Sequence, residues 1–349
     1  HQCLQRGAPR HSGRAPAALL GHATCGIRRG AAVVRAAASL AAVVLLLLTS
    51  CGEERPAVAP RPTLTPTVAP ATATAPPARV VVDMLGRSVG LPAEVTRVVA
   101  LSPTAYDLLT ALGIEPVAAT SDAPPSGGGT VIGRTLSPDF QAVAALTPDL
   151  VVADARFHSG LIRDLDAFPY PTFFVNVNGY GDVLAALRAL GDAVGRRERS
   201  EQAADTIQRQ AEVIRTRVAQ ERAPKVLVLT GVERDLYAAS RETYVGNLLT
   251  FLGAVNVMAD APAGAPLPGF AATSPGDAVA LAPDVILVIP AGDGSLAEQI
   301  VRDPAWAAVP AVAAGRVYTL DVRRFLRAPG PSVVDALAEL ARLLYPSVP

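Results

Sequence analysis

Two stretches of the chain share one pattern: Leu146-Thr147-Pro148-Asp149-Leu150-Val151-Val152 and Leu281-Ala282-Pro283-Asp284-Val285-Ile286-Leu287. In each, a Pro-Asp pair closes a helical segment and an apolar, β-branched run follows without polar alternation. Such a run is typical of a parallel strand that is buried on both faces. A helix with paired leucines that ends at a glycine precedes each copy, over 106–113 and over 244–253. The repetition predicts an α/β protein with two Rossmann-like lobes, each built on a mostly parallel sheet.

The segment between the two copies is almost free of proline and rich in helix-forming residues. Gly191 and Gly195 predict a local break in it. The part that follows, 198–222, carries apolar residues at helical spacing, namely Ala203, Ile207, Ala211, Ile214 and Val218. We therefore expect an N-terminal lobe over 79–180, connecting helices over 181–222 and a C-terminal lobe over 223–349. Because one long helix joins the lobes, we expect modest lobe motion and a ligand cleft between them.

Shorter elements are expected where the first lobe begins. Strands are predicted over 79–83 and 88–91 around a turn at Gly86, then over 98–101 and 116–119. A helix over 104–112 should end at Gly113, because glycine is a common C-terminal stop.

The first fifty residues combine basic charge with a short apolar run. Residues 1–50 hold six arginines and no acid, and the apolar run covers 36–48. This run is shorter than the roughly 20 residues of a membrane-spanning helix, so it predicts an export signal, with a mis-called start within 1–27. The sequence Leu48-Thr49-Ser50-Cys51 resembles a bacterial lipobox, which predicts that Cys51 is lipidated and anchors the protein to a membrane.

Residues 51–78 are dominated by proline, alanine and threonine, so we expect a disordered spacer between the lipidated Cys51 and the folded part. Cys3 and Cys25 lie in the segment to be discarded, and no disulfide is expected. After residue 50 the chain has 25 basic and 31 acidic residues. Because a nucleic-acid partner requires a basic face, none is expected.

Several motifs together resemble the ferric-siderophore and cobalamin class of periplasmic binding proteins, class III, whose lobes are joined by a helix. They are Asp83-x-x-Gly86-Arg87-x-Val89-x-Leu91-Pro92, the run 97–103, the two Pro-Asp strands, Trp306-x-x-Val309-Pro310-Ala311-Val312 and Gly315-Arg316-Val317-Tyr318. The resemblance covers 79–345. It implies a monomeric, extracytoplasmic solute-binding lipoprotein of an ABC importer, with no cofactor of its own. The implied ligand is a metal chelate, a ferric siderophore or a cobalamin-type corrinoid, delivered to a permease and its ATPase subunits.

The resemblance also implies where the ligand lies, because doubly wound sheets bind ligands at the carboxyl ends of their strands. Arginine forks would hold anionic oxygens, and aromatic rings would cover flat ligand faces. Arg327 is the position on which this expectation depends most. The residues carried over by position are Ser102, Pro103, Thr104, Tyr106, Ser121, Asp122, Arg156, Phe157, His158, Arg234, Tyr237, Phe270, Arg324, Phe325 and Arg327.

One departure from the family concerns permease docking. Members carry an acid on the outer tip of each lobe, and Gln141 and Gly276 stand at those positions here. Asp139 and Asp277 lie close by, so docking would use Asp139, Gln141 and Asp277, or be weaker. The two acids equally fit a role as helix N-terminal charges.

Other functions were weighed on the same residues. A site for free zinc or manganese requires several histidines, but only His158 follows Cys51. A haem-binding protein of the same fold would ligate iron through Tyr106, Tyr237 or His158, and a surface receptor or sensor would keep the fold without transport. A hydrolase is disfavoured because no Gly-x-Ser-x-Gly elbow occurs, and the glycines at 127–129 and 133 fit no phosphate-binding loop. We therefore expect a binding protein and no enzyme.

Overall fold

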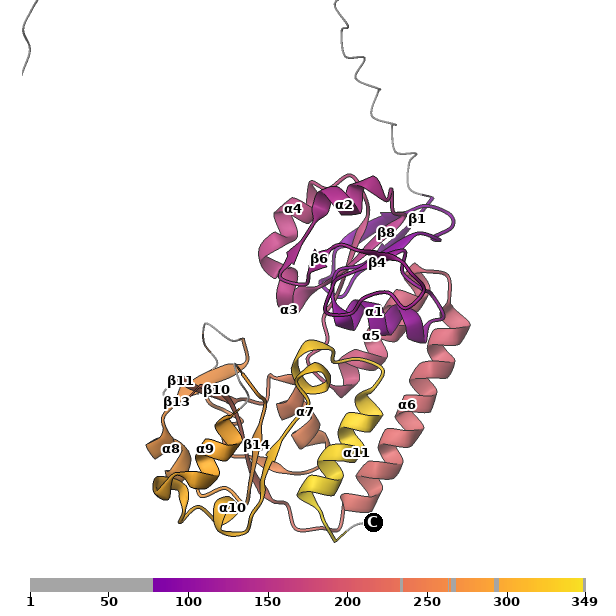
Figure 1. Cartoon of the computed structure of the whole chain (residues 1–349). Helices are drawn as coiled ribbons and strands as arrows, with labels where there is room; N and C mark the ends of the chain where they lie inside the picture. The colour runs from indigo at the N-terminus through magenta and orange to yellow at the C-terminus, as the bar shows by residue number, and fades with distance from the viewer. Residues whose placement is uncertain (1–77, 233–234, 263, 265–267, 292–294, 348–349) are drawn as a thin grey trace, which may run out of the picture. The chain divides into compact units, whose positions relative to one another are not determined.

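The computed structural model describes residues 78–347 apart from 233–234, 263, 265–267 and 292–294 (Figure 1). These residues all belong to one compact unit, Pro70–Pro349. The expected export signal, lipidated Cys51 and spacer lie outside the described residues. Within the described part, no helix combines the length and apolar character that a membrane crossing requires.

The N-terminal lobe is built on a five-stranded sheet whose neighbouring strands all run parallel, in the order β5-β4-β3-β8-β9. Helices and two small hairpins surround it. Their bounds are β1 Arg79–Val82, β2 Ser88–Leu91, β3 Val98–Ala100, α1 Pro103–Ala111, β4 Ala118–Ala119, β5 Thr130–Val131, β6 Gly133–Arg134, β7 Ser137–Pro138, α2 Phe140–Ala145, β8 Leu150–Asp154, α3 Ala155–His158, η1 Ser159–Leu161, α4 Ile162–Asp166 and β9 Thr172–Val175.

The C-terminal lobe has a mixed sheet in the order β13-β11-β10-β14-β15, with β12 also paired to β10. The pairings of β10 with β12 and β14, and of β14 with β15, are parallel, whereas β10–β11 and β11–β13 are antiparallel. The bounds are β10 Lys225–Val232, β11 Asp235–Ala239, α7 Tyr244–Phe251, β12 Val255–Asn256, β13 Phe270–Thr273, α8 Pro275–Ala280, β14 Val285–Val288, α9 Leu296–Arg302, η2 Pro304–Trp306, α10 Pro310–Ala313, β15 Val317–Thr319, the π-helical turn η3 Arg323–Arg327 and α11 Val333–Leu344.

The internal repeat is visible in the backbone. Thr147 and Ala282, at matching positions before the two Pro-Asp pairs, adopt positive φ values of 43° and 44°. The carboxylate of Asp149 accepts the backbone amide of Arg97 at 2.8 Å, and that of Asp284 accepts the amide of Lys225 at 2.9 Å. Each aspartate thus ties its own strand to the start of the neighbouring strand, which confirms that the two stretches are one structural unit used twice.

Two helices connect the lobes. Helix α5 covers Tyr180–Ala193 and helix α6 covers Arg197–Val218, with Gly195 at φ 68° between them. Gly191 lies inside α5, where an added Cβ would stand 2.4 Å from Ser200 of α6, so it serves close helix packing rather than the break. Helix α6 contacts both α5 and α11 (Figure 1).

One hydrophobic core runs through both lobes. Residues of the N-terminal sheet, of α5 and α6 and of the C-terminal lobe belong to the same buried cluster, which includes Val152, Leu187, Ile207, Val228 and Leu337. The predicted apolar face of the long helix is therefore buried mainly through Ile207, Ala211 and Val218.

Candidate binding site

A pocket of about 90 Å³ is lined by residues of both lobes. Pro103 follows β3, Asp122 follows β4 and Phe157 lies in α3 after β8, so all three stand beyond the carboxyl ends of parallel strands. Arg327, at the end of η3, contributes from the C-terminal lobe. The structure therefore brings together four of the residues carried over from the family. The complete lining in the described part is Pro103, Asp122, Arg134, Thr135, Leu136, Phe157 and Arg327.

Three lining residues were missed by the sequence analysis because they belong to the short β6–β7 hairpin. Arg134 ends β6, and Thr135 and Leu136 form the turn before Ser137. The Leu136 side chain is 74% exposed, which is unusual for a large apolar residue at the tip of a turn. Gly133 and Pro138 flank this stretch, and such punctuation marks a turn whose exposed leucine could have signalled a contact site.

Charge in the pocket is uneven. The side chains of Arg134 and Arg327 form no hydrogen bond or ion pair with another described residue, so both guanidinium groups are free to bind a ligand. Burial favours a higher pKa for Asp122, but hydrogen bonds from Thr135 and Thr120 outweigh it and hold the pKa below its ordinary value. The pocket thus offers two unpaired cations and one hydrogen-bonded carboxylate.

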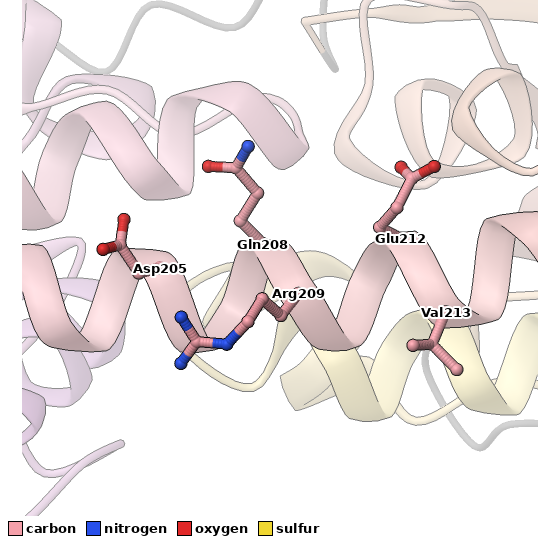
Figure 2. A pocket seen from close by; sticks show the side chains of 5 residues that line it. All are labelled: Asp205, Gln208, Arg209, Glu212 and Val213. Atoms are coloured by element: carbon pink, nitrogen blue, oxygen red, sulfur yellow. The ribbon is translucent and has the colours of Figure 1, made fainter.

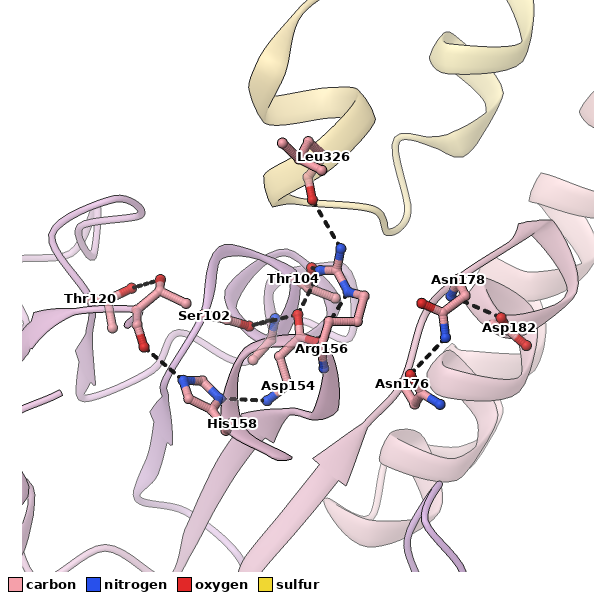
Figure 3. A network of polar contacts seen from close by, with 12 residues as sticks. Ser102, Thr104, Thr120, Asp154, Arg156, His158, Asn176, Asn178, Asp182 and Leu326 are labelled. Carbon is pink, nitrogen blue, oxygen red and sulfur yellow. Dashed lines mark hydrogen bonds and ion pairs between the residues drawn. The ribbon is translucent and has the colours of Figure 1, made fainter. Parts of the chain in front are cut away.

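A buried polar network that includes Arg156 lies beside the pocket (Figure 3). The Arg156 guanidinium donates to Asp154 through Nε at 3.2 Å and Nη2 at 2.7 Å, and to Thr104 Oγ1 at 2.9 Å. Its Nη1 donates to the carbonyl of Leu326 in η3 at 3.0 Å. In this structure Arg156 thus links the two lobes, and its contact with a ligand stays a prediction.

The network also accounts for His158, which is fully buried. Its Nδ1 accepts the backbone amide of Asp154 at 3.0 Å, so Nε2 carries the proton and donates to the carbonyl of Thr135 at 2.8 Å. Burial lowers the pKa of His158 below its ordinary value. Both ring nitrogens are engaged, so the prediction that His158 contacts a ligand or ligates haem iron is not supported.

Other predicted contacts of the N-terminal lobe point elsewhere. Ser102 is buried and caps α1, where its Oγ accepts the amide of Ala105 at 3.1 Å. Thr104 is buried in the network with Arg156. The hydroxyl of Tyr106 bonds Glu115 and Ser126, each at 3.0 Å. Ser121 is exposed next to Asp122 but does not line the pocket.

In the C-terminal lobe, most of the predicted contacts support the fold. Phe270 and Phe325 are 4% and 1% exposed and belong to the core, and Tyr237 packs against it. Arg324 is ion-paired with Glu339 of α11. Arg234 lies outside the described residues. Both phenylalanine rings are buried in this structure, and the expectation that these aromatic rings cover a ligand stays a prediction.

The expected docking residues stand at two helix starts. Asp139 caps α2 by accepting the amides of Gln141 and Ala142, each at 3.0 Å, and Gln141 is exposed. Asp277 lies in the first turn of α8 and accepts the Ser274 hydroxyl at 2.7 Å. Both acids are exposed, and each is used as a helix N-terminal charge.

A second hollow, of about 570 Å³, lies along α6 (Figure 2). Its described lining is Asp205, Gln208, Arg209, Glu212 and Val213, all from this single helix. Because no second described element brings converging polar groups to it, we do not treat this hollow as a binding site.

Comparisons with known proteins agree with this geometry. The family model described as periplasmic binding protein matches residues 98–323. The substrate-binding lipoprotein YvrC of Bacillus subtilis, an uncharacterized ABC transporter component, is 24% identical over 276 residues, which cover 76% of this chain and 84% of YvrC. The Fe(3+) dicitrate-binding periplasmic protein FecB of Escherichia coli is 26% identical over 213 residues, which cover 59% of this chain and 67% of FecB.

Solved structures share the fold. An ABC transporter substrate-binding protein from Listeria monocytogenes has a TM-score of 0.65 at 21% identity, covering 72% of this chain and all of that one. The haem complex of Staphylococcus aureus IsdE has a TM-score of 0.62 at 21% identity, covering 72% of this chain and 99% of that one. The two-lobed α/β fold is thereby confirmed, and the family model bears out the expectation of a binding protein. Since the family model spans well over half of its length, the chain belongs to the periplasmic binding protein family.

Proposed function

We propose that this protein captures an anionic, carboxylate-bearing ferric chelate outside the cytoplasm and delivers it to the permease and ATPase subunits of an ABC importer. One observation carries the choice of ligand: the side chains of Arg134 and Arg327, from opposite lobes, line one pocket and have no hydrogen-bond or ion-pair partner in the described part of the chain. A guanidinium group binds a carboxylate with two parallel hydrogen bonds. A neutral ligand would leave both guanidinium charges without an anionic partner. The similarity to FecB, named for ferric dicitrate, supports the same chemistry.

The size of the pocket limits how such a ligand binds. Sites for small molecules enclose about 300–1,000 Å³, whereas this pocket encloses about 90 Å³. We infer that it receives one carboxylate arm, with the remainder of the chelate held at its mouth against Leu136 and Phe157. Asp122 can accept a hydrogen bond from a hydroxyl of the ligand.

The alternatives find less support in the described residues. Haem iron takes an axial His, Cys, Met or Tyr ligand, and no such residue lines the described pocket. His158 and Tyr106 are bonded elsewhere. A corrinoid would require a large apolar surface, and only Pro103, Leu136 and Phe157 supply one here. A receptor without transport would share the site, and uptake measured with and without an ABC permease would separate the two roles.

Membrane attachment through Cys51 is part of the proposal. It is supported by the lipobox-like sequence 48–51 and by YvrC, which is named a lipoprotein. Replacing Cys51 with serine should move the protein from the membrane fraction to the soluble fraction. Docking to the permease would use Asp139, Gln141 and Asp277, which stand at equivalent helix starts of the two lobes.

Calorimetric titration of the purified protein tests the ligand class. We expect heat from ferric dicitrate and none from neutral ferric hydroxamates, cobalamin or haem. Arg134→Ala and Arg327→Ala should each weaken binding by about 10- to 100-fold, because a hydrogen bond to a charged group contributes about 1.5–3 kcal/mol.

Arg302→Ala is the matched control, since Arg302 is 79% exposed in α9 and outside the pocket. Its affinity should stay within about twofold of wild type if long-range charge contributes little. Tight binding of haem or cobalamin that neither pocket variant weakens would refute the proposed ligand class.

A further inference from the structure

The turn that carries Arg327 is attached to its own lobe by two side chains. In η3, Phe325 is 1% exposed in the hydrophobic core, and Arg324 forms an ion pair with Glu339 of α11. The amide of Ala328 closes the turn by donating to the carbonyl of Arg323 at 2.7 Å. The Arg327 side chain has no hydrogen-bond or ion-pair partner among the described residues, so its place over the pocket depends on where η3 lies.

The same turn is also held on the N-terminal lobe. Arg323 Nη1 donates to Asp107 Oδ2 at 2.9 Å, and Arg323 Nη2 donates to Asp107 Oδ1 at 2.8 Å. This is a bidentate pair between η3 and α1, in which the Asp107 side chain is 20% exposed and that of Arg323 is 49% exposed. The Leu326 carbonyl makes the second contact by accepting Arg156 Nη1 at 3.0 Å.

We propose that the Arg323–Asp107 pair, called here the inter-lobe clamp, sets the affinity for the anionic ligand by holding Arg327 over the part of the pocket that the N-terminal lobe supplies. The inference rests on the proposed function. Arg323 and Arg327 are four residues apart, so a shift of one end of this short turn displaces the other. Both residues of the clamp lie outside the pocket lining, and each is therefore a positioning residue.

The size of the effect on affinity follows from the fraction of molecules that are competent to bind. The apparent dissociation constant equals the intrinsic value divided by the fraction of molecules in the binding-competent arrangement. If loss of the clamp leaves Arg327 in place in about one molecule in five, the apparent dissociation constant rises about fivefold. The loss should shrink at high salt, because the pair is partly exposed and is screened.

Calorimetry with ferric dicitrate tests the clamp through a double-mutant cycle. Asp107→Ala and Arg323→Ala should each weaken binding about three- to tenfold, and the charge-reversed pair Asp107→Arg with Arg323→Asp should recover at least half of that loss in log affinity. Arg323→Ala should add no further loss in a chain that already carries Arg327→Ala. A pair that only stabilises the fold would leave the affinity of the folded protein unchanged, and a pair that acts independently of Arg327 would give losses that add.

Arg302→Ala again controls for the loss of one positive charge in Arg323→Ala, and it is a general surface control for Asp107→Ala. Wild-type affinity in Asp107→Ala, or full additivity with Arg327→Ala, overturns the proposal. If wild-type protein does not bind ferric dicitrate, the proposed ligand class fails, and hydrogen exchange of the amides of Phe325 and Ala328 tests the clamp in the ligand-free protein. Faster exchange in Asp107→Ala than in Arg302→Ala supports the clamp, and equal exchange overturns it.

Discussion

Replacement of Arg156 by methionine should lower the free energy of unfolding more than replacement of any exposed arginine. The reason is that it leaves the buried carboxylate of Asp154 without its ion-pair partner. The Asp154 side chain is fully buried, and that of Arg156 is 16% exposed. Without Arg156, the carboxylate keeps the backbone amide of residue 156 at 3.1 Å and Ser102 Oγ at 3.4 Å as donors. Removing one partner of a buried ion pair costs about 3–5 kcal/mol.

The double variant isolates the cause. Asp154→Asn combined with Arg156→Met removes both charges and keeps an acceptor for the amide at 156. We expect it to be about 2 kcal/mol more stable than Arg156→Met alone, since the uncompensated charge is gone. The single variant should lose roughly 6–20 °C in melting temperature, at about 2–4 °C per kcal/mol for a chain of this size.

Urea unfolding at neutral pH measures both variants, with Arg188→Met as the control. Arg188 pairs with Glu201 on the surface, where the two side chains are 39% and 50% exposed. Its replacement should cost less than about 1 kcal/mol. If the double variant is less stable than Arg156→Met, the two losses add, and the cost comes from packing of the Arg156 side chain rather than from the charge of Asp154.

Two further predictions concern pH and backbone strain. Burial lowers the folded-state pKa of His158 below its ordinary value of 6.5, so the unfolded chain binds a proton more readily. This contribution to the free energy of unfolding is fully present above the ordinary pKa of 6.5. It is lost as pH falls toward the lower folded-state pKa, by at most about 1.4 kcal/mol per pH unit. His158→Asn should flatten this pH dependence of the urea midpoint, and an unchanged slope would contradict the assignment. Ala282→Gly removes the strain of a φ of 44°. The free energy of unfolding should rise by up to about 1 kcal/mol in thermal unfolding, because the relief of about 1–2 kcal/mol exceeds the entropy cost of glycine. A lower melting temperature in Ala282→Gly would show that the turn is not strained.

Much of the fold could be predicted because its signals are local. Gly113 and Gly253 both adopt a φ of 74° at helix ends, as expected of glycine stops. The two Pro-Asp strands are buried throughout, as their unbroken apolar runs predicted. The antiparallel β11 and β13 were not foreseen, because strand direction depends on pairing between distant segments.

The site was predictable only in part, for a related reason. The rule that ligands bind beyond the carboxyl ends of parallel strands located Pro103, Asp122 and Phe157, because it depends on chain position alone. It could not tell whether a side chain at such a position faces the pocket or the interior, and His158 and Ser102 face inward. Arg134, in β6, and Leu136, in the turn after it, were missed because the β6–β7 hairpin lies outside the main sheet.

The shared core restricts how a ligand can enter. Leu187, Ile207 and Leu337 belong to one buried cluster that joins the lobes, and separating the lobes would expose it at about 25 cal/mol per Å² of apolar surface. The β6–β7 hairpin and the Arg327 side chain lie outside this cluster and line the pocket. Opening the pocket by shifts of Leu136 and Arg327 avoids that cost, whereas a wide separation of the lobes incurs it. We therefore expect ligand entry to depend on the hairpin and on η3, and the proposed inter-lobe clamp predicts that the ion pairs that hold η3 influence ligand affinity.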